Sequence, residues 1–140
     1  MIEDWNDPEY CLEAVKQNGY ALQYVKEQTP EMCLEAVKEH GNALEYVKEQ
    51  TPEICLAAVK IDGQALRFVK EQTSEMCLEA IKEIGFALDY VEEQTPLIIH
   101  YLKKYHTSLY KSFKTKNRIT ISENEMKKFY NENPHLLLTL

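Results

Sequence analysis

Residues 29–50 read TPEMCLEAVKEHGNALEYVKEQ, and this stretch decides the fold. One copy of the pattern precedes it and two follow it, all in the same register of 22 residues. The cysteines that recur in this register are Cys11, Cys33, Cys55 and Cys77, and the glycines are Gly19, Gly41, Gly63 and Gly85. A fixed period of this length indicates a stacked array, in which each unit buries its apolar face against its neighbours.

Each repeat carries two signals for a break in the chain. Thr29 and Pro30 predict the start of a helix, because threonine caps a helix and proline fits its first turn. Gly41 predicts a left-handed helix end, since glycine adopts a positive φ without a steric penalty. We therefore expect one helix over about residues 30–40 and a second helix over about residues 42–50 in this repeat.

One uninterrupted amphipathic helix per repeat, lying on a lipid surface, is the alternative arrangement. A proline in each repeat is also a feature of lipid-surface helices, so the period alone does not decide. A glycine inside a helix costs about 1 kcal/mol relative to alanine, however, and its recurrence in every repeat favours a turn. The sequence thus predicts an all-α fold, a short α-solenoid of four 22-residue helix-turn-helix repeats with a helical C-terminal cap.

The central part of the repeat resembles a known family. Its core reads AVKxxGxALxY, and it lies within residues 12–25, 34–47, 56–69 and 78–91, with small changes between copies. This core resembles the uncharacterised helical repeat known as domain of unknown function 4116, found mostly in giant amoeba-infecting viruses and amoeba-associated bacteria. The resemblance implies a helical array and a viral or amoebal setting, and it brings no activity. The linker KEQTP is tighter than is usual for that family, so the helix packing can differ.

Residues 1–95 are expected to form the solenoid, and residues 96–140 a degenerate fifth repeat with a basic helical cap, in one continuous folded unit. Thr107 occupies the glycine position of the fifth repeat, so we expect one longer helix from Pro96 to about Phe113. A polar loop follows, and Ser122 begins a capping-box helix through about residue 132. The apolar tail, residues 135–140, is predicted to pack back on the cap or to form a dimer contact.

The net charge of −7 is unevenly distributed along the chain. Residues 1–95 carry 20 acidic and 8 basic side chains, whereas residues 96–140 carry 3 acidic and 8 basic side chains. The acidic solenoid repels nucleic acid and anionic membranes, so only the C-terminal third is suited to contact phosphates. With no apolar stretch near the ~20 residues of a membrane span and no signal-peptide pattern, we predict a cytoplasmic protein, in the host-cell cytoplasm if it is viral.

The cysteines and histidines do not form a pattern typical of catalysis or metal binding. Stacked helices lie about 8–10 Å apart, beyond the ~7 Å Cα limit for a disulfide between equivalent cysteines. No Cys-x-x-Cys pair is present, and His100 and His106 point to different sides of a helix. We predict buried structural cysteines, no metal, no cofactor, no small-molecule substrate and no enzymatic activity.

Positions that differ between the repeats are free to specify a partner, and they concentrate around the glycine. We name the candidate partner-binding set the variable rim: Tyr20, His40, Asn42, Ile61, Gln64, Arg67 and Phe86. The leading hypothesis is a protein-interaction scaffold that binds a protein partner, or another copy of itself, through this rim. Neutral drift on exposed turns is the alternative explanation of the variation.

The second functional hypothesis is nucleic-acid binding by the basic C-terminal cap. Its candidate residues are Lys103, Lys104, Lys111, Lys114, Lys116 and Arg118. They are interleaved with Tyr105, Tyr110 and Phe113, and this combination supports phosphate contacts together with base stacking. The alternative is a solvated cap whose positive charge offsets the acidic solenoid.

Overall fold

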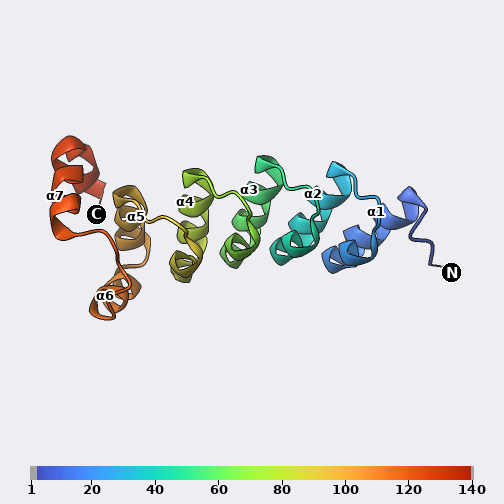
Figure 1. Cartoon of the computed structure of the whole chain (residues 1–140), viewed down its shortest axis with the longest axis horizontal. Helices are drawn as coiled ribbons and strands as arrows, with labels where there is room; N and C mark the ends of the chain where they lie inside the picture. Colours follow the sequence, from blue (N-terminus) through green and yellow to red (C-terminus); the bar gives the residue numbers. More distant parts are fainter. Residues whose placement is uncertain (1–2, 140) are drawn as a thin grey trace.

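The computed structural model describes residues 3–139, and every regular element in this range is helical. The repeats are built from α1 Pro8–Gln17, η1 Gly19–Tyr24, α2 Pro30–Glu39, η2 Gly41–Tyr46, α3 Pro52–Ile61, η3 Gly63–Phe68, α4 Ser74–Glu83 and η4 Gly85–Tyr90, where η denotes a 3-10 helix. Figure 1 shows the repeats following one another in a single row along the long axis. The predicted α-solenoid is confirmed, and the ends of the two predicted segments, residues 1, 2 and 140, lie outside the described residues.

The α-helices begin where the threonine and proline signals predict. The hydroxyl of Thr29 accepts a hydrogen bond from the backbone N–H of Met32 (3.2 Å), and Pro30 occupies the first turn of α2. Thr73 makes the same cap with Met76 N–H (3.2 Å), although Ser74 follows it in place of proline. The hydroxyl cap alone therefore suffices to start the helix of the fourth repeat.

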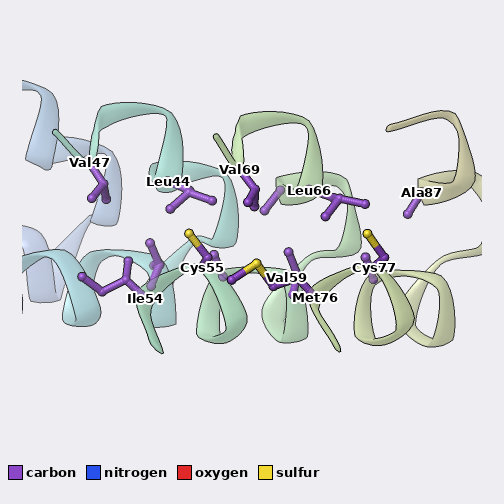
Figure 2. Close-up of a cluster of buried hydrophobic side chains, with 14 of the residues drawn as sticks. Leu44, Val47, Ile54, Cys55, Val59, Leu66, Val69, Met76, Cys77 and Ala87 are labelled. Carbon is purple, nitrogen blue, oxygen red and sulfur yellow. The ribbon is translucent and has the colours of Figure 1, made fainter. Parts of the chain in front are cut away.

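The core lies between a layer of α-helices and a layer of 3-10 helices. Figure 2 shows Cys55 and Val59 of α3 facing Leu44 and Leu66, which come from η2 and η3. All four side chains are buried. The four repeated cysteines are likewise buried, as predicted, and act as small apolar residues in this layer.

The glycines have a role different from the one predicted. No glycine among residues 3–139 has a positive φ, so the predicted left-handed helix end is wrong. A Cβ atom on Gly41 would lie only 2.5 Å from the carbonyl oxygen of Ala58 in the next repeat. A Cβ on Gly63 would lie 2.6 Å from the carbonyl oxygen of Ala80. Glycine is needed at these two positions because the start of the 3-10 helix approaches the backbone of the following α-helix this closely.

The second helix of each repeat is shorter and tighter than predicted. In the second repeat it is a six-residue 3-10 helix that ends at Tyr46, and Val47 is already extended (φ −76°, ψ 117°). The next N–H, that of Lys48, donates to the side chain of Gln28 in the preceding repeat (3.0 Å) and not to a carbonyl of its own helix. This bond to the neighbouring repeat ends the helix before the predicted residue 50.

The C-terminal cap consists of α5 Pro96–Tyr105, α6 Thr107–Thr115, α7 Glu123–Glu132 and η5 Pro134–Thr139. The single long helix predicted from Pro96 to about Phe113 is wrong, because the chain breaks at His106. His106 has a non-helical backbone, and its Nε2–H donates to the carbonyl oxygen of Ile81 in α4 (2.7 Å). This tertiary contact holds the break although no glycine is present.

The remaining cap elements follow the sequence more closely. The left-handed helix end occurs after α6, at Asn117 (φ 56°), where asparagine tolerates this backbone conformation. The Ser122 capping box is present, with Glu125 as its second member. η5 contacts α7, which directly precedes it, and Leu137 and Leu138 remain 51% and 89% exposed. No helix within residues 3–139 is long and apolar enough to cross a bilayer.

Candidate binding surfaces

A ladder of glutamine side chains joins each repeat to the next. Gln28 Nε2 donates to the carbonyl oxygen of Tyr46 (2.7 Å), and Gln28 Oε1 accepts from Lys48 N–H (3.0 Å). Each amide thus pairs with two backbone groups of the following repeat, in the manner of one extra peptide unit. Sequence reasoning missed this role, although the same glutamine in every copy of KEQ was the available signal.

The rungs of the ladder are nearly identical along the array. Gln50 bonds Phe68 O (2.7 Å) and Lys70 N (3.0 Å), and Gln72 bonds Tyr90 O (2.6 Å) and Glu92 N (3.0 Å). Gln94 bonds Arg118 O (3.0 Å) and Thr120 N (2.8 Å). The loop after α6 therefore takes the place of the next repeat's linker and closes the array at its C-terminal end.

Six members of the variable rim lie where an α-helix ends and a 3-10 helix begins, whereas Arg67 lies near the end of η3. Some of these members pair across repeat boundaries. The ring of Tyr20 stacks on His40, with centroids 4.5 Å apart and an interplanar angle of 12°. The side-chain amide of Asn42 donates to Asp62 Oδ2 (2.9 Å), and its own Oδ1 is buried without a hydrogen-bond partner. The structure thus brings Tyr20 and His40 together and gives part of the repeat-to-repeat variation a structural use.

Three apolar members of the variable rim are open to solvent. Tyr20, Ile61 and Phe86 expose 37%, 49% and 53% of their surface. Gln64 and Arg67 are also exposed, and the Arg67 guanidinium lies 4.5 Å from the ring centroid of Phe68. Apolar side chains therefore reach the surface in the first, third and fourth repeats, on the same edge of the solenoid.

A second surface, which sequence reasoning missed, lies at the opposite ends of the α-helices. Ten helical residues place it about 15 Å from the variable rim. Here the chain links one repeat to the next, and a hollow opens at each junction. We call this row the linker edge, and its hollows have volumes of 440, 280, 370 and 140 Å³ from the first junction to the last.

The hollows of the linker edge repeat the same chemistry. Each has a buried cysteine in its lining and one apolar residue of the following α-helix, namely Met32, Ile54, Met76 or Ile98. Lysine, glutamate and the ladder glutamine line the second and third hollows. Burial raises the pKa of the Cys77 thiol to about 11, with Glu92 adding to the effect, so this cysteine is a protonated thiol at neutral pH. No group of three or more His, Cys, Asp or Glu side chains in residues 3–139 is placed to hold a metal.

The comparisons with known proteins agree with the repeat architecture. The model of a family described as Domain of unknown function (DUF4116) matches residues 29–74. This segment carries the DUF4116 repeat. The family resemblance inferred from the sequence is therefore confirmed for the second and third repeats. No curated protein and no solved structure matches the chain.

The DUF4116 segment contains one complete junction of the array. Gln50 and both of its backbone partners lie within it, as does the close approach of Gly41 to Ala58. The hydrogen bond between Asn42 and Asp62 also lies inside the match. The matched segment thus contains contacts that join the second and third repeats.

The basic cap lies outside the DUF4116 match, and its six candidate residues differ in their surroundings. Arg118 forms an ion pair with Asp89, and its guanidinium lies 4.4 Å from the ring centroid of Phe113. Lys114 Nζ donates to Glu123 Oε1 (2.9 Å), and this bond raises the pKa of Lys114. Two of the six cations are thereby already neutralised by acids of the same chain.

The other four candidate cations of the cap have different surroundings. Lys103 Nζ lies 5.3 Å and 5.6 Å from the ring centroids of Tyr110 and Tyr130, between α6 and α7. Lys104 lies 5.4 Å from the ring of Tyr105. Lys111 and Lys116 are exposed on or next to α6. Nucleic-acid binding by the cap stays a prediction.

The docking of α7 on α5 is centred on a buried histidine. His100 is fully buried, and its Nδ1 lies 3.0 Å from the hydroxyl of Tyr130. Burial lowers the pKa of His100 below its ordinary value of 6.5, and the charges of Lys104 and Lys103 lower it further. His100 is therefore harder to protonate in the folded cap than in the unfolded chain.

We expect the free energy of unfolding to fall as the pH drops below the ordinary histidine pKa of 6.5. The sign follows because only the unfolded state gains the proton there, so the stabilisation is complete above 6.5 and is lost below it. His100→Phe keeps an aromatic ring that does not titrate, and it should show a shallower pH dependence. Chemical denaturation at about pH 7.5 and about pH 5.5 measures this. His135→Phe, in the exposed tail, should keep the wild-type slope, and identical slopes for both variants would contradict the assignment.

Proposed function

We propose that this protein is a non-enzymatic interaction scaffold that binds a protein partner, or another copy of itself, through the variable rim. The observation that carries the proposal is the exposure of Tyr20, Ile61 and Phe86 on one edge of the solenoid. Large apolar and aromatic side chains surrounded by polar ones are typical of the centres of protein interfaces.

Contacts between aromatic rings support the proposal, because they hold two side chains of the variable rim in place. Tyr20 is held by its stack on His40, and Phe86 contacts Phe113 edge to face, with centroids 5.8 Å apart. A side chain that is already ordered loses less conformational entropy on binding than a mobile one. The rim therefore offers preorganised anchors at positions that differ from repeat to repeat, which suits recognition of one specific partner.

Affinity capture with the full chain as bait tests whether the variable rim binds a partner. Tyr20→Ala, Ile61→Ala and Phe86→Ala combined should reduce captured partner by about tenfold at equal bait concentration, as expected for loss of interface anchors. Tyr105→Ala removes an exposed aromatic residue away from the rim and should leave capture within about twofold.

Circular dichroism and light scattering complete this experiment. The helical signal of the triple variant should match the wild type, because the three side chains are largely outside the core. Light scattering over a range of concentrations tells a foreign partner from self-association, since only the latter changes the mass of the isolated chain. Equal capture by the wild type and the triple variant would refute the rim as the binding surface.

A further inference from the structure

The linker edge has a regular spacing that restricts what can bind along it. Neighbouring hollows share lining residues: Lys26 and Thr29 belong to the first and second, and Lys48 and Thr51 to the second and third. Gln72 and Thr73 connect the third to the fourth. The hollows thus form a continuous row with one hollow per repeat, and stacked helices are about 8–10 Å apart.

This spacing matches one kind of polypeptide. A polyproline II helix rises about 3.1 Å per residue with three residues per turn, so every third side chain returns to the same face after about 9.3 Å. A β-strand returns its side chains about every 6.8 Å and would fall out of register within two hollows. An α-helix is about 10 Å wide, too broad to enter hollows of 140 to 440 Å³.

The lining of the second and third hollows favours an apolar side chain. The second hollow has Cys33 and Ile54 in its lining, and the third has Cys55 and Met76, all of them buried. A cavity of about 150 Å³ holds a benzene molecule, so the three larger hollows accommodate a side chain the size of leucine. One apolar side chain per repeat would fill the space left between the linkers.

The net charge along the linker edge favours a basic segment. The three larger hollows contain equal numbers of lysines (Lys26, Lys48, Lys70) and glutamates (Glu27, Glu49, Glu71), and the fourth adds Glu92 and Glu93. One of these lysines already has a hydrogen-bond partner within the chain, since Lys48 Nζ donates to the carbonyl oxygen of Lys26 (2.7 Å). Residues 1–95 as a whole carry 20 acidic and 8 basic side chains, which attracts cations to this part of the chain at long range.

We propose that the linker edge binds a basic, extended polypeptide segment in the polyproline II conformation, which inserts an apolar side chain into successive hollows at every third residue. The surface is distinct from the variable rim and lies at the other ends of the α-helices. A result that contradicts one of the two proposals therefore leaves the other unaffected.

A synthetic peptide of five Leu-Pro-Lys triplets, carrying a fluorescent label, tests the proposal by anisotropy with the full chain. It should bind at least about tenfold more tightly than a peptide of equal composition with irregular leucine spacing. A Leu-Pro-Glu peptide should bind more weakly than the basic one, and added salt should weaken the basic peptide, because the attraction is partly electrostatic.

Two matched variants locate the site on the molecule. Glu49→Trp fills the second hollow and should weaken binding of the basic peptide by about tenfold. Glu45→Trp makes the same change of size and charge on the exposed face of η2 and should stay within about twofold of wild type. Both variants leave the buried core unchanged, so circular dichroism should show equal helicity.

Several results would overturn the proposal. Equal binding of the regular and irregular peptides would exclude the spacing argument, and equal or tighter binding of the acidic peptide would exclude the charge argument. Equal loss in Glu45→Trp and Glu49→Trp would place the site elsewhere. A concentration-dependent dimer that Glu49→Trp dissociates would show that a second copy of the chain covers the linker edge instead.

Discussion

Gly41→Ala should lower the free energy of unfolding by about 3 kcal/mol, at the upper end for overpacking at a tight contact. The added Cβ would lie 2.5 Å from the carbonyl oxygen of Ala58 and 3.1 Å from the backbone N of Asp62. Both obstacles are backbone atoms of the next α-helix, which cannot move aside as a flexible side chain can. The two repeats would have to separate, and the buried contacts between η2 and α3 would weaken. Denaturant unfolding followed by circular dichroism measures the change.

Two comparisons show whether the cost arises from the close approach. A Cβ on Gly85 meets side-chain atoms of Leu109 and His106, so Gly85→Ala should cost less than Gly41→Ala. Gln64→Ala changes an exposed residue next to a glycine and should stay within about 0.5 kcal/mol of wild type. If Gly41→Ala unfolded at the wild-type denaturant concentration, the packing of the repeats would have to be wider than described.

Gln50→Leu should lower the free energy of unfolding by about 2 kcal/mol, because it removes two hydrogen bonds to the backbone of about 1 kcal/mol each, in addition to the weak one that Cys55 Sγ donates to Gln50 Oε1 (3.4 Å). The side chain keeps its bulk, but the carbonyl oxygen of Phe68 and the N–H of Lys70 both lose their partner. Gln23→Leu is the matched control, since its Nε2 donates only to Tyr20 O of its own repeat (3.0 Å) at an exposed position. Equal effects of the two changes would contradict the ladder.

A second substitution at Gln50 separates its donor from its acceptor. Gln50→Glu keeps an oxygen for Lys70 N–H but turns an ionised carboxylate toward the carbonyl oxygen of Phe68. That repulsion raises the pKa of the new carboxyl in the folded state above the ordinary value of about 4.3. The deficit relative to wild type should therefore be largest near neutral pH and should shrink as the pH falls toward about 5. A deficit that does not change with pH would exclude this geometry.

The candidate surfaces were only partly predictable from the sequence. Variation between repeats located the variable rim, because equivalent positions of a stacked array must lie on the same edge. It did not show that Tyr20 stacks on His40 or that Asn42 bonds Asp62, since these contacts join positions 20 residues apart in different units. The linker edge was missed because its hollows arise between repeats and have no motif within any one of them.

The 22-residue period by itself determined the all-α array, the helix starts and the burial of the cysteines. These features depend on local capping and on which residues recur, and both can be read along a single chain. The tertiary structure alone decided how the repeats join. The carbonyl oxygen of Ala58 leaves no room for a side chain at position 41, so glycine is required there. The Gln50 side chain forms hydrogen bonds with the backbone of the third repeat. The helix break at His106 is accompanied by the hydrogen bond from its ring to the carbonyl oxygen of Ile81. Each of these constraints comes from an atom about 20 residues away, so no local pattern contains it.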